Sequence, residues 1–235
     1  MLWKKLQAAA EASQGDVRAY LDGQGVKYQS FWIDNIIAVE NSSRSTLNGL
    51  LAFNEIEIIR APRLMHVIEP EKSVDSVNAP NAVEPNIAHV LAPNAWADGY
   101  RGEGMVVANI DTGVRSTHQA LVRQYRGTSS GSHNYNWLGA AGGSLTPVDD
   151  HGHGTHTMGT IVGEDATLAN QIGVAPGAQW IACDGCEGTG CPDVALLTCA
   201  QWIAAPYPIG SPGSPDPNMR PNVVNNSWGD WWSEL

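Results

Sequence analysis

The chain has 235 residues, of which 43% are hydrophobic, and its 24 Asp and Glu outnumber its 13 Lys and Arg, giving a net charge of -11 at pH 7. This length suits one large or two smaller globular domains. The acidic excess argues against nucleic acid as a partner, because phosphate binding needs clustered Lys and Arg. No run approaches the roughly 18 apolar residues that a membrane span requires, so no membrane partner is expected.

Residues 1–70 predict a small α+β unit. Val17, Tyr20 and Leu21 share one face of a helix, and short runs of β-branched and aromatic residues follow it. The predicted elements, in order, are a helix that ends at Gly23, strands over residues 28–33 and 36–39, a helix capped by Ser45, and a strand over residues 56–59. No apolar stretch follows the basic residues near Met1, so these first residues do not predict an export signal.

Residues 70–95 are rich in Pro, Asn, Ser and Ala and show no sustained hydrophobic period. Such a composition is typical of an extended, exposed linker that proteases can reach. We therefore expect a boundary within residues 70–86. The predicted organisation is a first domain over residues 1–75, a linker and the first segment of a second domain over residues 76–95, and the rest of that domain over residues 96–235.

From Gly102 onward the pattern alternates between strands and helices. The predicted elements are a strand over residues 105–110, a helix from His153 to Gly163, a strand over residues 179–183, a helix that opens at Pro192-Asp193, and a strand over residues 223–225. Strands that alternate with helices predict an α/β fold with a doubly wound parallel sheet.

Asp111 and His153 are the candidate catalytic residues. Asp111 follows the apolar run over residues 105–110, at the carboxyl end of a predicted strand, where open α/β sheets place their active sites. His153 lies between Gly152 and Gly154, so the backbone there can pack closely. A carboxylate that holds a histidine fixes the imidazole tautomer and stabilises its charged form, as in a Ser-His-Asp triad. We expect the two side chains within hydrogen-bond reach.

The cluster of His151, His153 and His156 leaves a metal site open as an alternative. No carboxylate accompanies these histidines at the spacing of a His-Glu-x-x-His motif, so we assign no metal ligands. Asp149 and Asp150 lie near the candidate site in sequence and are expected to form a solvated loop.

Four cysteines lie within 17 residues, with spacings that approach zinc-knuckle patterns but with no histidine among them. In an exported chain, an even and clustered set of cysteines favours two disulfides, while zinc binding and free thiols remain alternatives. Of the three possible pairings we favour Cys186–Cys191 together with Cys183–Cys199.

Three segments together resemble the subtilisin-like serine proteases, or subtilases. They are Asp111-Thr112-Gly113-Val114, the run from His153 to Gly159, and the run from Val223 to Gly229. The intervening sequence is similar to the bacillopeptidase F branch of that family. The resemblance is strong over about residues 78–235 and looser before them.

The resemblance implies a serine endopeptidase that hydrolyses polypeptide substrates. Asp111 would orient His153, and His153 would act as the general base. Ser227, Trp228 and Gly229 would belong to the strand that binds substrate. The resemblance further implies secretion, no cofactor for catalysis, and structural calcium at positions that the sequence does not assign.

The family places its nucleophile in a Gly-Thr-Ser-x-Ala motif downstream of the substrate-binding strand, and this sequence has no such motif there. Ser129, in Gly127-Thr128-Ser129-Ser130, precedes His153 in the chain, which is the wrong order, so we interpret that segment as a polar loop. The position of His156 is a packed, structural histidine in the family. The sequence is therefore expected to be a fragment that lacks both an export signal and the serine, and to be inactive alone.

Residues 1–75 resemble the subtilase propeptide, which folds as a ferredoxin-like inhibitor and chaperone of its own protease. Self-cleavage would then fall within residues 70–95, and an unrelated small domain is the alternative. Two rival functions are a secreted binding or inhibitor module on a non-catalytic scaffold and a zinc-stabilised interaction protein. The presence of both Asp111 and His153 favours the enzyme.

Overall fold

The computed structural model describes residues 2–70, 83–167 and 170–230. It divides the chain into two compact units, the first ending at Arg63 and the second beginning at Leu64. This division precedes the expected boundary within residues 70–86, because the residues from Leu64 onward already pair with strands of the second unit. No helix in these three ranges combines the length and apolar character of a membrane span.

The first unit consists of two helices and a β-hairpin. Its elements are α1 (Leu2–Gly23), β1 (Tyr28–Phe31), β2 (Ile36–Val39) and α2 (Arg44–Leu50). The two strands run antiparallel. Val17 and Leu21 of α1 pack with Leu50 of α2, so the predicted apolar face of the first helix closes a small core.

Two details of this unit differ from the sequence-based expectation. Ser43 caps α2 in place of Ser45, because Ser43 immediately precedes the helix and its hydroxyl accepts the backbone N–H of Thr46 at 3.1 Å. The strand predicted over residues 56–59 is absent, and Ile58 is 73% exposed. In the described part of this unit the sheet has two strands, so the expected ferredoxin-like arrangement is not seen.

The second unit is built on a four-stranded parallel sheet with the strand order β5-β6-β4-β8. Its strands are β4 (Val106–Asp111), β5 (Trp137–Gly139), β6 (Gln179–Asp184) and β8 (Val223–Asn226). The register of β4 and β6 places Asp111 beside Asp184. This parallel sheet with intervening helices confirms the predicted α/β class.

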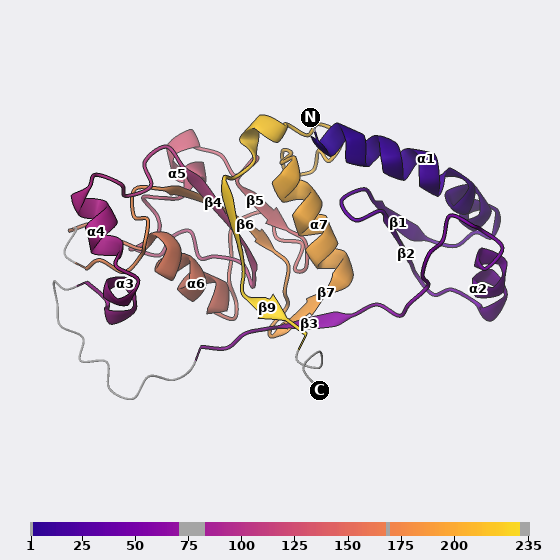
Figure 1. The fold of residues 1–235 in the computed structure, drawn as a ribbon, viewed down its shortest axis with the longest axis horizontal. Coiled ribbons are helices and arrows are strands. Elements are labelled where there is room, and N and C mark those ends of the chain that lie inside the picture. The colour runs from indigo at the N-terminus through magenta and orange to yellow at the C-terminus, as the bar shows by residue number, and fades with distance from the viewer. Residues whose placement is uncertain (1, 71–82, 168–169, 231–235) are drawn as a thin grey trace. The chain divides into compact units, whose positions relative to one another are not determined.

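Helices cover both faces of the parallel sheet (Figure 1). Because successive strand residues point to opposite faces, Ala108 and Ile110 of β4 pack with α7 (Asp193–Ala204), whereas Val107 packs with α6 (His153–Val162). Burial of both faces explains why β4 and β6 are nearly continuous apolar runs in the sequence.

A second, antiparallel sheet lies where β6 and β8 end. Its strands are β3 (Leu64–Val67), β7 (Gly190–Pro192) and β9 (Trp228–Gly229), in the order β7-β3-β9 (Figure 1). The central strand, β3, comes from far earlier in the chain than its two neighbours. We call the position between β7 and β9 the central strand site.

Part of the predicted linker is helical. Residues 83–95 include α3 (Pro85–His89) and most of α4 (Ala92–Ala97), each with a proline in its first turn, where the missing N–H costs no helical hydrogen bond. The rest of the predicted linker, over residues 76–82, lies outside the described residues. The remaining elements are the short helix α5 (Arg126–Ser130) and the 3-10 turn η1 (Pro217–Met219).

Candidate active site

The end of β4 and the start of α6 bring Asp111 and His153 together. Asp111 is the last residue of β4 and His153 the first of α6. The Asp111 Oδ1 atom lies 2.6 Å from Nδ1 of His153, and each side chain is only 1% exposed. The structure thus places the two predicted residues within hydrogen-bond reach, in an interior where their interaction is weakly screened.

The carboxylate of Asp111 is fixed by further donors. The backbone N–H of Thr112 donates to Oδ1 at 2.8 Å, and the Thr157 hydroxyl donates to Oδ2 at 3.2 Å. Thr157 lies one turn after His153 on α6, so the helix that carries the histidine also orients the acid. These bonds hold the carboxyl group in one orientation.

Glycine at position 154 is what allows α6 to approach β4 so closely. A Cβ atom there would lie 2.0 Å from the Gly113 carbonyl oxygen and 3.1 Å from Cβ of Asp111. Any side chain would therefore force the two elements apart. The close packing inferred from the glycines that flank His153 has this physical basis.

Asp149 organises the turn that leads into α6. Its Oδ1 accepts the Thr112 hydroxyl at 2.9 Å and the Gly152 N–H at 2.7 Å, and its Oδ2 accepts the Thr155 N–H at 2.8 Å. The Thr112 hydroxyl in turn accepts the N–H of Gly154 at 2.9 Å. The expectation of a merely solvated loop was wrong for Asp149. An aspartate shortly before a helix that opens on Gly-His-Gly is the signal that identifies such a capping role.

The other side of the His153 ring faces the backbone of Ile68, the residue that follows β3. Nε2 lies 2.9 Å from the carbonyl oxygen of Ile68. Both ring nitrogens therefore face oxygen atoms that only accept, and making both hydrogen bonds requires a doubly protonated ring. Burial lowers the pKa of His153, but the hydrogen bonds to Asp111 and Ile68 and the charges of Asp111 and Glu69 outweigh it and raise that pKa.

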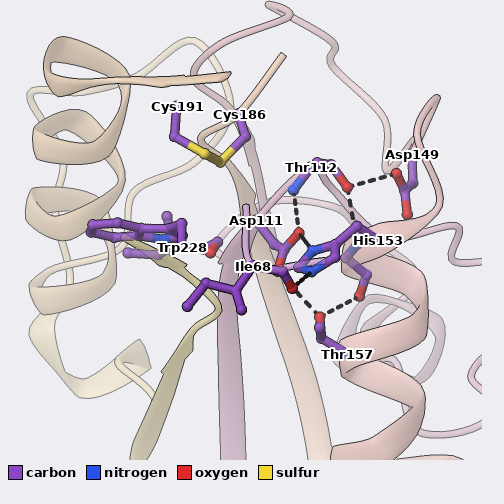
Figure 2. Close-up of a disulfide and its surroundings, with 11 residues drawn as sticks. Ile68, Asp111, Thr112, Asp149, His153, Thr157, Cys186, Cys191 and Trp228 are labelled. Carbon is purple, nitrogen blue, oxygen red and sulfur yellow. Dashed lines mark hydrogen bonds and ion pairs between the residues drawn. A yellow bond between two sulfur atoms is a disulfide. The ribbon is translucent and has the colours of Figure 1, made fainter. Parts of the chain in front are cut away.

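Ile68 reaches His153 because β3 fills the central strand site. Val67 lies opposite Trp228 in the sheet, and the Val67 N–H donates to the Thr189 carbonyl at 3.0 Å. The next N–H, that of Ile68, donates to the Ser227 carbonyl at 2.9 Å. The backbone of β3 thus lies between two strands as an extended peptide. At its end, Ile68 lies beside the His153 ring (Figure 2).

The three residues predicted to bind substrate line this site. Ser227 contributes its carbonyl oxygen, and Trp228 and Gly229 form β9, with Gly229 opposite His66. The indole N–H of Trp228 donates to the Ile110 carbonyl at 3.0 Å, which ties β9 to β4. Sequence reasoning missed Ile68, because no residue type marks a backbone carbonyl.

The remaining histidines do not form a metal site. His151 points its Nε2 toward Glu69 at 3.5 Å, and His156 is exposed, so its expected role as a packed, structural histidine is wrong. Across the described ranges, no group of three His, Cys, Asp or Glu side chains is arranged to hold a metal ion. Ser129 lies in α5 and not in a loop, and its hydroxyl donates to Arg126 and accepts from Gln179.

All four cysteines are in disulfides, in the pairing favoured from the sequence. Cys183–Cys199 joins β6 to α7, with the two Cα atoms 5.6 Å apart, and Cys186–Cys191 spans a tight turn, with its Cα atoms 4.0 Å apart. No thiolate remains for zinc, so the zinc-stabilised alternative is wrong for this structure.

Asp184 is a second buried acid beside the candidate pair. It ends β6 as Asp111 ends β4, and it is 6% exposed. Its Oδ2 accepts the Gly142 N–H at 3.2 Å, while Oδ1 has no hydrogen-bond partner among the described residues. Burial, with a contribution from the charges of Asp149 and Asp150, raises the pKa of Asp184 to about 6. Sequence reasoning missed Asp184, although its position at the end of an apolar strand is the same signal that identified Asp111.

Comparison with known proteins agrees with this geometry. Bacillopeptidase F of Bacillus subtilis (strain 168) is 38% identical over 98% of this chain and 17% of its own length. Subtilisin BL of Lederbergia lenta is 39% identical over 60% of this chain and 49% of its own length. The chain therefore spans less than half of each of these relatives.

A solved structure shares the fold. Fervidolysin from Fervidobacterium pennivorans, a keratinolytic enzyme related to subtilisin, matches with a TM-score of 0.52 over 93% of this chain and 34% of that chain, at 16% identity. The family model for the subtilase family, peptidase S8, matches residues 102–234, which is more than half of the sequence. The chain belongs to the subtilase family.

Proposed function

We propose that this chain is part of a serine endopeptidase precursor in which Asp111 and His153 are two of the three triad residues. The observation that carries the proposal is the 2.6 Å contact between Asp111 Oδ1 and His153 Nδ1, beside a site that holds an extended peptide backbone. The serine peptidases among its relatives support the same class of reaction.

The proposed roles follow from which ring nitrogen each partner faces. Asp111 accepts the Nδ1–H of His153, so Nε2, which faces the peptide backbone, is the atom that would take up and return the proton once the ring is neutral. A serine hydroxyl beside Nε2 would give its proton to His153 as its oxygen attacks the peptide carbonyl carbon. When the C–N bond breaks, His153 returns that proton to the leaving amine, while Asp111 remains a carboxylate.

We propose that the nucleophile comes from outside the described residues. Within them, the hydrogen-bond partners of the His153 ring are Asp111 and Ile68, and no serine hydroxyl is among them. We propose that a Gly-Thr-Ser-x-Ala segment supplies the serine and an Ala-Gly-Asn segment the oxyanion donor. Without them the 235-residue chain hydrolyses no peptide, since losing one oxyanion donor costs about 100- to 1,000-fold and losing the nucleophile costs more.

We further propose that the residues up to Ile68 act as an intramolecular propeptide. The support is the occupation of the central strand site by Leu64–Ile68, with the Ile68 carbonyl on His153. A backbone held there excludes any other polypeptide from the same hydrogen bonds. The protease would thus stay inhibited until this segment leaves.

The proposed place of action is outside the cell. Two disulfides in a chain of this length are typical of proteins that fold in oxidising compartments. Family membership alone does not decide this, because the relatives include a major intracellular serine protease and a minor extracellular protease, both of Bacillus subtilis (strain 168). The proposed serine chemistry needs no cofactor, and a structural calcium ion stays a proposal without assigned ligands.

A pair of histidine variants tests the proposal. Peptide and casein hydrolysis would be measured for a form of the protein that includes the serine-bearing segment, alongside His153→Ala and His156→Ala. His153→Ala is expected to lower kcat by about 10⁴-fold or more, because it removes the base of the proposed triad. His156 lies on the same helix but is exposed, so His156→Ala is expected to keep its activity.

Three outcomes would contradict the proposal. Hydrolysis that survives His153→Ala would show that this residue is not the base, and a protein without any peptidase activity would fit a non-catalytic scaffold. Turnover by the 235-residue chain alone that disappears with Ser129→Ala would show that the nucleophile lies in α5.

A further inference from the structure

The disulfide Cys186–Cys191 lies against the central strand site (Figure 2). Cys191 is the middle residue of β7 and lies opposite Met65 of β3. Both cysteines are buried, at 3% exposure for Cys186 and 0% for Cys191. A covalent link therefore enters the strand that pairs with the bound peptide backbone.

Apart from the disulfide, β7 is held by its continuation into α7 at Asp193 and by the packing of Cys191 in the core, and few backbone hydrogen bonds fix its register. It has three residues and lies at the edge of its sheet, with β3 as its neighbour on one side. The turn before it is closed by a reciprocal pair of backbone hydrogen bonds between Glu187 and Gly190, at 2.8 and 3.1 Å. When β3 leaves the site, β7 loses its strand partner, and a strand this short has few hydrogen bonds of its own to keep its register.

The other end of the disulfide is fixed to the triad acid. The backbone N–H of Cys186 donates to the Asp111 carbonyl at 3.1 Å, and that of Gly185 donates to the same oxygen at 2.9 Å. The opposite strand, β9, is tied to the preceding residue of β4 by the bond from the Trp228 indole to the Ile110 carbonyl. The two strands that flank the central strand site are therefore held by consecutive residues at the end of β4. The indole of Trp228 ties β9 to Ile110, and the disulfide links β7 to Cys186, which is bonded to Asp111.

We propose that Cys186–Cys191 is a positioning element for substrate, which keeps β7 in register with the triad when the central strand site is empty. This inference rests on the proposed function. It concerns the peptide residues two to four positions before the reacting carbonyl, because β7 pairs with Leu64, Met65 and His66, whereas that carbonyl belongs to Ile68. The disulfide thus determines how well long peptides bind, and it leaves the chemistry at the carbonyl to Asp111 and His153.

Substrates of two lengths test this role in the form that carries the serine. The long one is Leu-Met-His-Val-Ile p-nitroanilide, which copies residues 64–68, and the short one is N-acetyl-Ile p-nitroanilide, which does not reach β7. Cys186→Ala/Cys191→Ala is expected to raise KM for the long substrate by about tenfold, the loss of one or two net hydrogen bonds, and to leave its kcat within about twofold. For the short substrate both constants are expected to stay within about twofold.

The second disulfide supplies the matched control. Cys183→Ala/Cys199→Ala removes the link between β6 and α7, which does not enter β7. This variant is expected to lose stability but to keep the parent's ratio of kcat/KM between the long and short substrates. If Cys186→Ala/Cys191→Ala leaves the ratio of kcat/KM between the long and short substrates unchanged, whether or not both values fall, the proposal is overturned.

Hydrogen exchange of the 235-residue chain gives a readout that does not depend on activity. In Cys186→Ala/Cys191→Ala, the amides of residues 64–68 are expected to exchange about tenfold faster or more, while those of β4 keep their protection. A second variant, Cys186→Ala/Cys191→Val, keeps a β-branched residue in β7. If both variants lose the protection of β4, the disulfide serves the whole fold and the proposal is overturned. If the serine-bearing parent cleaves neither substrate, the proposed function fails, while the exchange result still decides the role of the disulfide.

Discussion

The carbonyl oxygen of Ile68 lies 2.9 Å from Nε2 of His153, on the side of the imidazole ring opposite Asp111. This contact joins the backbone of Ile68, the residue after β3, to the base of the proposed triad. It also fixes the register of the bound segment, because the Ile68 N–H is held by the Ser227 carbonyl. The peptide bond presented to His153 is therefore the one between Ile68 and Glu69.

We predict that a serine-bearing form of the protein cleaves itself between Ile68 and Glu69, so that the processed chain begins at Glu69. The sequence-based expectation lay later, within residues 70–95. Ile68→Pro removes the N–H that bonds to Ser227 and is expected to slow this cleavage strongly. N-terminal sequencing and intact mass during processing would measure both results.

Ile58→Pro is the control for that substitution, since Ile58 is an exposed residue outside any strand. It is expected to process at the rate of the parent. A first new N-terminus at another position, or equal processing of the two proline variants, would show that the register of Leu64–Ile68 does not select the bond.

Asp111→Asn is predicted to lower both the pKa of His153 and the rate. Burial would then be opposed only by the Ile68 hydrogen bond and the Glu69 charge, so the pKa of His153 should fall below its value in the parent. In the parent, the raised pKa contributes stability that is fully present below the unfolded pKa and is lost as the pH rises through the folded pKa. NMR titration of the 235-residue chain measures the pKa, and kcat of the serine-bearing form is expected to fall about 10⁴-fold.

Glu69→Gln is the comparison for the titration. Glu69 is exposed, and its charge is the smallest of the named influences on His153, so this change should move the pKa down only slightly. A pKa of His153 that is equal in Asp111→Asn and the parent would contradict the assigned contact.

The part of the site that the sequence predicted consists of side chains at the ends of periodic elements. Asp111 ends a nearly continuous apolar run, and His153 opens a helix between two glycines. Both residues could therefore be predicted from the sequence as members of the site. The same logic reaches the fold class, because apolar runs that alternate with helices leave few arrangements. The contact of the Ile68 carbonyl with His153 could not be predicted from the sequence, because the register between strands from distant segments depends on backbone geometry.

The other errors of the sequence-based predictions have a related cause. Residues 56–59 alternate Ile and Glu as a half-buried strand does, yet no strand forms there, because pairing requires a neighbour that the local pattern does not specify. Pro85 and Pro93 suggested an extended linker but lie in the first turns of helices, where proline is favoured. The role of Asp149 was missed because capping depends on where the turn closes.

Asp149→Ala is predicted to lower the free energy of unfolding of the 235-residue chain by about 2 kcal/mol, because it leaves several N–H and hydroxyl donors near the start of α6 without an acceptor. Asp150 is its exposed neighbour, and Asp150→Ala is expected to change stability by no more than about 0.5 kcal/mol. Urea unfolding measures both. Equal effects of the two substitutions would mean that Asp149 acts only through its charge.

The raised pKa of Asp184 predicts how the free energy of unfolding changes with pH. Its ordinary pKa of 3.8 is raised to about 6 in the fold, so between these values the folded chain holds a proton that the unfolded chain releases. The contribution of this proton is complete below about pH 4 and is lost as the pH rises through about 6. Above that pH, the buried carboxyl is charged, and the backbone N–H groups of Gly142 and Cys186 offset the cost of its burial only in part.

Asp184→Asn replaces the carboxyl with a neutral group of similar shape and removes this titration. The variant is therefore predicted to gain stability relative to the parent as the pH rises from 4 to 7, by up to about 3 kcal/mol. Urea unfolding of the 235-residue chain across that range measures the difference. Asp98→Asn, at an exposed aspartate after α4, is the control and is expected to change the free energy of unfolding by no more than about 0.5 kcal/mol. If the curve for Asp184→Asn also runs parallel to that of the parent, Asp184 does not take up the proton, and its burial is compensated by a donor that the described residues do not include.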